Sequence, residues 1–354
     1  SLIYERIKLI MAYTTINKSS LHMNTKLYTG TGSSQSITGV EFQPDLVWIK
    51  KRNGGEQHVL FDAIRGVQKY ITSSGTAAES TTATTLTAFN SDGFTQGGHG
   101  MTGANSGTYA SWNWKANGAG VANTDGSISS TVSANTTSGF SIVKWTGSGA
   151  NATIGHGLSV PPKMILFKNT SRAIHWVTYD SNGGAGKYLH LEDSFAYSTS
   201  TSMFNNTEPT SSVFSVGGNN QNNTSGENII AYCFADVQGY SKFGSYTGNG
   251  SDDGSFIYTG FKPSFFLVKR TDSTSSWTML DNKRDPFNVT TERLFPNENV
   301  AASVGTNANT DFLSNGVKIR VNHGNFNASG GSYIYMAFAE APLVGTNNVP
   351  ATAR

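Results

Sequence analysis

Short apolar runs alternate with turn-rich polar stretches along the whole 354-residue chain. Runs such as LVWIK (46–50) and SIVKW (141–145) have the length and the β-branched and aromatic content of strands. Clusters of Gly, Asn, Ser and Thr, such as GGNNQNNTSGEN (217–228), separate these runs and predict turns and loops. Few segments show a period of 3.6 residues. The pattern therefore predicts an all-β protein built from antiparallel strands.

The same pattern occurs three times. YTGTG (28–32), WTGSG (145–149) and YTGNG (246–250) open three similar blocks. In each block a proline precedes an apolar strand that ends in Lys, and a second strand ends in Asp. Equivalent residues are separated by 118 and 101 positions, and this framework consists of Lys50, Lys168 and Lys269 and of Asp62, Asp180 and Asp281. A register shared by separate motifs predicts three tandem β-sandwich or jelly-roll-like repeats.

The spacing of the blocks also predicts the domain boundaries. A long polar linker predicts freedom between the first two repeats, whereas the short connection VQGYSK (237–242) predicts that the last two pack in a fixed relation. Met11 resembles a natural start, so residues 1–10 are interpreted as an upstream extension, helical with Ile3, Ile7 and Ile10 on one face. The expected segments are an N-terminal extension or attachment arm (1–24), repeat 1 (25–118), a linker (119–138), repeat 2 (139–238), repeat 3 (242–342) and a C-terminal tail (343–354).

Composition and charge narrow the functional classes. Charged residues make up 14% of the chain and the net charge is +2, which gives no basic footprint for nucleic acid. Aromatic residues make up 11%, so the chain is expected to fold. No apolar run is long enough for a transmembrane helix, so we expect no membrane insertion. The one cysteine, Cys233, excludes an intrachain disulfide and is expected to be a small buried hydrophobe.

A search for catalytic motifs finds no candidate. The seven histidines show no HExxH motif and no paired spacing, and the chain has neither a GxSxG elbow nor a P-loop. GNGSDDGS (248–255) lacks the alternating ligands and distal Glu of a calcium loop. We therefore expect no enzyme, no cofactor and no metal site.

The repeated framework residues are interpreted as structural. An Asp at the end of a strand accepts backbone N–H groups of the following turn. Asp62 and Asp281 are each followed three residues later by an arginine, Arg65 and Arg284, which predicts a local ion pair. Repeat 2 has DSNG there, so its Asp180 lacks this partner. The repeated lysines are expected to end strands at the rim of each sandwich.

The loops that differ between repeats are the candidate ligand contacts. Neutral amides and hydroxyls can exchange hydrogen bonds with sugar hydroxyls at a small desolvation cost. Two Asn-rich loops, 217–228 and 322–332, fit this chemistry, and each site is expected to bind weakly. The predicted ligand-binding residues are Asn219, Asn220, Asn222, Asn223, Asn322, Asn325 and Asn327.

The three blocks resemble repeat-bearing tail-fibre-like or structural virion proteins of marine tailed bacteriophages. The resemblance covers nearly all of residues 11–345. No ligand residue of that family is carried over. The segments that carry the resemblance include LYTGTGSSQSITGVEFQPDLVWIKKRN (27–53), LFDAIRGVQKYI (60–71), GHGLSVPPKMILFKN (155–169) and AYCFADVQGYSKFGSYTGNG (231–250).

The resemblance implies a virion component made in the host cytoplasm, a fibre or adhesin on the tail or capsid. Its expected partners are other virion proteins, copies of itself in a homo-oligomer, with a trimer favoured by analogy with phage fibres, and host surface polysaccharide. Three alternatives remain open: a secreted or cell-surface carbohydrate-binding protein outside a virion, a capsid-decorating protein without a receptor role, and a polysaccharide-cleaving tailspike.

Overall fold

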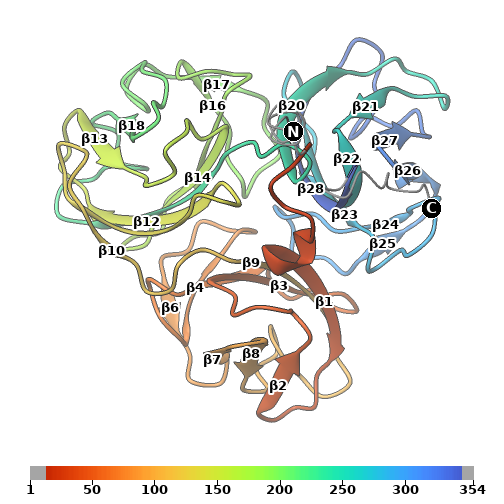
Figure 1. The fold of residues 1–354 in the computed structure, drawn as a ribbon, viewed down its shortest axis with the longest axis horizontal. Coiled ribbons are helices and arrows are strands. Elements are labelled where there is room, and N and C mark those ends of the chain that lie inside the picture. The colour runs from red at the N-terminus through yellow and green to blue at the C-terminus, as the bar shows by residue number, and fades with distance from the viewer. Residues whose placement is uncertain (1–12, 345–354) are drawn as a thin grey trace, which may run out of the picture.

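The structure, a computed structural model, describes residues 13–344 and confirms the all-β prediction. Strands make up 42% of the chain. The helical segments among the described residues are two short 3-10 turns, η1 (Ser19–Leu21) and η2 (Thr306–Ala308). Figure 1 shows three lobes around a common centre, with repeat 1 in red to orange, repeat 2 in yellow to green and repeat 3 in teal to blue.

Each lobe contains a large antiparallel sheet in which four strands pair in the same order. The register also recurs, because equivalent residues of the third strand oppose the framework aspartates: Leu46 opposes Asp62, Met164 opposes Asp180 and Phe265 opposes Asp281. The four strands are β1 (Met23–Thr29), β9 (Thr108–Trp114), β3 (Leu46–Lys51) and β4 (Val59–Asp62) in repeat 1; β12 (Phe140–Thr146), β19 (Asn228–Phe234), β14 (Met164–Asn169) and β15 (Val177–Asp180) in repeat 2; and β20 (Ser241–Thr247), β28 (Ser332–Pro342), β22 (Phe261–Arg270) and β23 (Thr278–Asp281) in repeat 3.

A smaller sheet covers the outer face of each large sheet and completes a sandwich. Apolar side chains from the two sheets form a separate core in each lobe. The strands of the smaller sheets are β2 (Gln35–Thr38), β8 (Gly93–Gln96) and β7 (Leu86–Asn90) in repeat 1; β13 (Ala152–Gly155) and β18 (Val213–Val216) in repeat 2; and β21 (Phe256–Tyr258), β27 (Gly316–Ile319) and β26 (Thr310–Leu313) in repeat 3.

The inner faces of the three large sheets share one central core. Because side chains alternate along a strand, Tyr232 and Phe234 of β19 point into this common core, whereas Cys233 points into the core of repeat 2. The aromatic ring of Trp114 in repeat 1 lies 6.2 Å from that of Phe234 in repeat 2 and 5.8 Å from that of Phe338 in repeat 3. Strands buried on both faces explain the nearly continuous apolar run IIAYCFA in the sequence.

Three equivalent backbone contacts join the lobes head to tail and close a ring. The N–H groups of Glu79, Tyr197 and Ala302 each donate to a carbonyl of the next repeat, at 2.7–2.9 Å. The acceptors are Thr170, Thr271 and Arg52. Each donor directly precedes the second strand of a small hairpin; the hairpins are β5 (Lys69–Thr72) and β6 (Ser80–Thr81), β16 (Lys187–Tyr188) and β17 (Ser198–Thr199), and β24 (Glu292–Arg293) and β25 (Ser303–Val304). Repeat 1 is therefore fixed to both of its neighbours, and the expected freedom between repeats 1 and 2 is wrong.

Two expected boundary segments differ from the structure. The expected linker 119–138 contains β10 (Val121–Asn123) and β11 (Ser130–Asn135), which extend the sheet of repeat 2 beside β12. The described part of the expected attachment arm packs on the ring, since Ile16 is buried in the central core. The expected helical face of Ile3, Ile7 and Ile10 and most of the expected tail 343–354 lie outside the described residues. Within residues 13–344, no helix has the length and apolarity to cross a membrane.

Candidate functional site

The framework lysines occupy equivalent strand positions but are buried, not at the rim. Lys50, Lys168 and Lys269 are each the second-last residue of their strand and are fully inaccessible to solvent. Their ammonium groups donate to backbone carbonyls; Lys168 Nζ, for example, donates to Thr76 O of repeat 1 at 2.9 Å and to Ile174 O at 2.6 Å. Burial lowers the pKa of all three lysines to about 8. Lys168 and Lys269 each donate to a carbonyl of the preceding repeat, and Lys50 donates to Lys51 O and Gly54 O of its own repeat, so the three lysines are not available to an external ligand.

The framework aspartates are also buried, and the predicted Asp–Arg pairs are present in repeats 1 and 3. Asp281 Oδ2 accepts from Arg284 Nε at 2.5 Å, and Asp62 pairs in the same way with Arg65. In repeat 2 the phenol of Tyr197 takes the place of the guanidinium and donates to Asp180 Oδ2 at 2.6 Å. These contacts support the structural interpretation of the three aspartates.

Three of the asparagines predicted to bind glycans point inward, which corrects that prediction. Asn222, Asn223 and Asn327 are fully buried. Asn223 Nδ2 donates to Ala150 O at 2.7 Å, and its Oδ1 accepts from Ser148 N at 3.0 Å. Both polar atoms of this buried amide are therefore bonded to the protein and do not face a sugar. Asn327 binds the corresponding loop of repeat 3 in the same way. The remaining predicted residues are exposed or half-buried, and they are Asn219, Asn220, Asn322 and Asn325.

An open groove between repeats 2 and 3 offers a larger surface. Its volume is about 620 Å³, and tyrosine rings, hydroxyl groups and a few charges line it. Tyr333 is almost fully buried, and its ring stacks against that of the half-buried Tyr246 with 4.9 Å between the ring centres. The accessible aromatic faces therefore come from Tyr246 and from the half-buried Tyr197, which has Lys187 Nζ 5.5 Å from its ring centre. Aromatic faces beside neutral hydroxyls are suited to sugar rings. The remaining lining residues include Asn182, Thr199, Ser245, Thr247 and Asp272.

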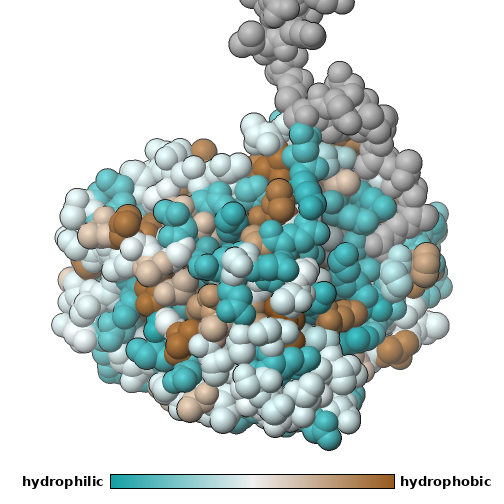
Figure 2. All heavy atoms as spheres, turned by 60° about the horizontal axis from the view of Figure 1, so that its bottom comes forward, coloured by the Kyte–Doolittle hydropathy of each residue, from teal (hydrophilic) through white to brown (hydrophobic). Residues whose placement is uncertain are grey.

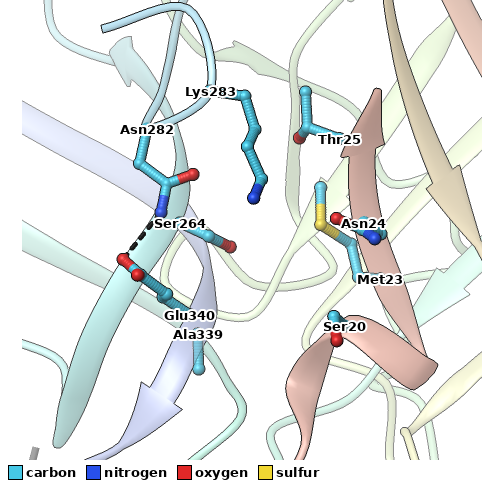
Figure 3. Close-up of a pocket in the computed structure, with 9 residues that line it drawn as sticks. All are labelled: Ser20, Met23, Asn24, Thr25, Ser264, Asn282, Lys283, Ala339 and Glu340. Carbon is cyan, nitrogen blue, oxygen red and sulfur yellow. Dashed lines mark hydrogen bonds between the residues drawn. The ribbon is translucent and has the colours of Figure 1, made fainter. Parts of the chain in front are cut away.

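A second pocket, between η1 and β1 on one side and repeat 3 on the other, is too small for a sugar ring. Its volume is about 40 Å³. Figure 3 shows the side chain of Lys283 pointing into it beside Asn282, whose amide donates to Glu340 Oε2 at 2.7 Å. Thr25 Oγ1 and Asn282 Oδ1 are buried there without another protein partner. The volume suits one or two water molecules that satisfy these atoms.

A cluster of histidine and acidic side chains in repeat 2 was not foreseen from the sequence. The ligand-capable atoms of its four members lie within 4.8 Å of one another. The two imidazole rings stack in parallel, with centroids 4.3 Å apart. Burial raises the pKa of Glu192, whereas the pKa of Asp193 is lowered: burial opposes this shift, and hydrogen bonds from His190 and the Phe195 N–H outweigh it. We name this group the His–acid cluster; it consists of His175, His190, Glu192 and Asp193.

One protein-family model matches the three-repeat ring as a whole. A family model described as a domain of unknown function, DUF7483, matches residues 18–342. The chain belongs to the DUF7483 family. The match begins just before η1 and ends with the last residue of β28, so the DUF7483 domain corresponds to the closed three-repeat ring and not to one repeat. Searches of curated proteins and of solved structures each found no match.

Proposed function

We propose that the chain is a non-enzymatic structural and surface-binding protein of a bacteriophage virion, a fibre or adhesin that contacts host surface glycans. The sequence resemblance to virion proteins supports the virion assignment. The observation that carries the glycan contact is the groove between repeats 2 and 3, where tyrosine rings lie beside neutral hydroxyl groups. The face drawn in Figure 2 agrees with this role, because its residues are mostly hydrophilic or near-neutral and its hydrophobic residues form small separate groups.

The fold supports the mechanical part of the proposal. Three sandwiches share one central core and a closed set of contacts, so the ring presents its loops and grooves on a rigid support. The ion pair that closes the ring joins Arg52 and Glu292, which are 240 residues apart in the chain. Weak single sites become effective when many copies are displayed on one particle. The expected homotrimer would supply such copies, and light scattering of the purified protein measures the oligomeric state directly.

Binding to purified bacterial polysaccharides tests the proposed contact. Thr247 is exposed at the end of β20 and lines the groove, so Thr247→Trp fills the groove without disturbing a core. Thr29 is exposed at the same strand position of repeat 1, and Thr29→Trp is the matched control. We expect Thr247→Trp to reduce polysaccharide binding in biolayer interferometry at least about tenfold and Thr29→Trp to leave it unchanged. If the wild-type protein binds none of a broad panel of lipopolysaccharides and capsular polysaccharides, the receptor role is wrong and a capsid-decorating role replaces it.

A further inference from the structure

Repeat 2 differs from the other two repeats in the chemistry of one hairpin. Equivalent positions in the three repeats are identified by shared contacts: the N–H groups of His58, Trp176 and Trp277 are bound by Ser74, Glu192 and Asn297, respectively. The four positions of the His–acid cluster hold Gln57, Thr72, Ser74 and Gly75 in repeat 1 and Ser276, Phe295, Asn297 and Glu298 in repeat 3. Only repeat 2 has four metal-ligating side chains at these converging positions. A shared fold does not need them, because repeats 1 and 3 form the same hairpin without them.

We propose that repeat 2 binds one divalent transition-metal ion through two imidazoles and two carboxylates, those of His175, His190, Glu192 and Asp193. The proposal goes beyond the proposed glycan contact and does not depend on it. Imidazole nitrogen together with carboxylate oxygen is a donor set that suits zinc and its first-row neighbours, and it disfavours magnesium and calcium, which prefer oxygen ligands.

The geometry of the ligand pairs fits such an ion. His190 Nδ1 lies 2.9 Å from Asp193 Oδ2, and His175 Nδ1 is in close contact with Glu192 Oε1. Two tetrahedral ligands on bonds of about 2.1 Å are about 3.4 Å apart, so both pairs would open by a small movement as the ion binds. All four ligand atoms lie within 4.8 Å of one another, and the exposed ring of His175 can move inward to complete the set.

A second shell of contacts orients the ligands. The side-chain oxygen of Gln221 lies 3.1 Å from His190 Nε2, which favours a proton on that nitrogen. In the metal-free chain Nδ1 donates to Asp193, and loss of that proton on metal binding would leave the Nδ1 lone pair free to ligate the ion. Glu192 Oε2 accepts from the N–H of Trp176 at 3.1 Å, which fixes the carboxylate while its other oxygen faces His175. An outer acceptor behind a ligating imidazole is typical of metal sites in proteins.

The site lies where repeat 2 meets repeat 3. His190 O accepts from Trp277 Nε1 at 2.9 Å, and Ser194 O accepts from Lys269 Nζ at 3.1 Å. The same loop leads to Tyr197, whose N–H donates to Thr271 O and whose ring lines the groove. A bound ion therefore stabilises both the contact between the repeats and one wall of the groove.

The repeats supply the variants that test the site. The double variant His175→Gln/His190→Thr places in repeat 2 the residues that repeat 1 carries at the same positions, so the hairpin is expected to fold. Glu192→Gln is a second variant that keeps an amide oxygen for the Trp176 N–H and removes one charge. The matched control is His323→Asn, because Asn219 stands at the equivalent position in repeat 2 and accepts the same kind of backbone hydrogen bond.

The experiment measures metal binding by the full chain after treatment with EDTA and dialysis into metal-free buffer. Calorimetric titration with ZnCl₂ is expected to give one site per chain, with a rise in Tm of a few degrees at saturation and no response to MgCl₂ or CaCl₂. The His175→Gln/His190→Thr and Glu192→Gln variants are expected to bind zinc at least about 100-fold and tenfold more weakly, respectively, while His323→Asn binds like the wild type. No zinc binding by the wild type, or equal binding by the double variant, would overturn the proposal and leave the cluster as hydrogen-bonded His–acid pairs.

Discussion

The phenol of Tyr232 in repeat 2 donates to the carboxylate of Asp62 in repeat 1, with 2.7 Å between Oη and Oδ2. The next contact around the ring is equivalent, since Trp112 Nε1 of repeat 1 donates to Asp281 of repeat 3 at 3.1 Å. The third position is different: Met336 of repeat 3 stands where a donor would be needed for Asp180. At this position, two of the three contacts between repeats therefore carry a side-chain hydrogen bond and the third has no donor.

Repeat 2 compensates within its own fold for the missing donor. Tyr197, at the position of Glu79 in repeat 1, reaches Asp180, and Gly183, at the position of Arg65, leaves room for its ring. A Cβ atom on Gly183 would come within 2.8 Å of that ring, so an arginine and this tyrosine exclude each other. The repeats thus stabilise a buried carboxylate in two alternative ways, with an arginine in repeats 1 and 3 and with a tyrosine in repeat 2.

The first prediction concerns replacing the arginine arrangement of repeat 1 with the tyrosine arrangement of repeat 2. Arg65→Gly leaves the buried Asp62 without its cation and is expected to lower the free energy of unfolding by about 3–5 kcal/mol. Adding Glu79→Tyr supplies a phenol as in repeat 2 and is expected to restore more than half of that loss. Urea unfolding followed by tryptophan fluorescence measures both. Glu79→Tyr alone is the control and is expected to give no gain, because Arg65 occupies the space; a double variant no more stable than Arg65→Gly contradicts the prediction.

The second prediction concerns stability at alkaline pH. Burial lowers the pKa of Lys50, Lys168 and Lys269 to about 8, whereas lysines of the unfolded chain titrate near 10.4. Between these values the unfolded chain binds more protons than the folded chain, so the free energy of unfolding rises with pH from about 8. The buried thiol of Cys233 acts in the opposite direction, because burial raises its pKa and only the unfolded thiol ionises in this range.

A comparison of two proteins isolates the contribution of one lysine. Lys168→Met is expected to reduce the rise in unfolding free energy between pH 8 and 9.5 by up to about 1.4 kcal/mol per pH unit, since one of the three titrating amines is gone and Cys233 is unchanged. Urea unfolding at half-unit steps of pH gives the two slopes. Measurements stop at pH 9.5 because buried tyrosines such as Tyr28, whose pKa is raised by burial, lower the stability at higher pH. Identical slopes would mean that Lys168 titrates normally in the folded chain.

The sequence predicted those parts of the structure that recur in register. The Lys and Asp framework and the Asp–Arg pairs followed from their constant spacing, because each belongs to a hairpin that is local in sequence. Ring closure had no such signal, since Arg52 and Glu292 meet only when all three lobes are in place. The short link between repeats 2 and 3 predicts a difference in rigidity between the two junctions, but all three repeats contribute to the shared central core and are fixed by it.

The candidate sites were harder to predict because they depend on where side chains point. Asn-rich composition does not distinguish an exposed amide such as that of Asn220 from a buried one such as that of Asn223. The spacing of His175 and His190 matches no metal-binding motif, so the sequence does not predict the His–acid cluster. The two histidines come together only through the turn of one hairpin. A position-by-position comparison of the repeats would have found it, since Gln57 and Ser276 stand where repeat 2 has His175.

The last prediction concerns the buried amide beneath the TG loops. In repeat 2 Asn223 binds this loop through Ser148 N and Ala150 O, whereas repeat 1 has Gly103 at the equivalent position. There Gln96 reaches over from β8 and donates to Ser33 O at 3.4 Å. A Cβ atom on Gly103 would lie 1.7 Å from Gln96 Oε1, so the two arrangements cannot coexist in one repeat.

A double-mutant cycle tests whether one arrangement can replace the other. Gly103→Asn alone is expected to destabilise repeat 1 by roughly 1–3 kcal/mol, because the new side chain collides with Gln96. Gln96→Val alone, which introduces the residue that repeat 2 carries as Val216, is expected to cost a similar amount, because the loop loses its amide. The double variant reproduces the pair of repeat 2, so the two losses should largely cancel and give a coupling energy above about 1 kcal/mol in urea unfolding. If the losses of unfolding free energy in the two single variants add in the double variant, the loop of repeat 1 cannot be held by an asparagine. The buried amide would then be specific to each repeat.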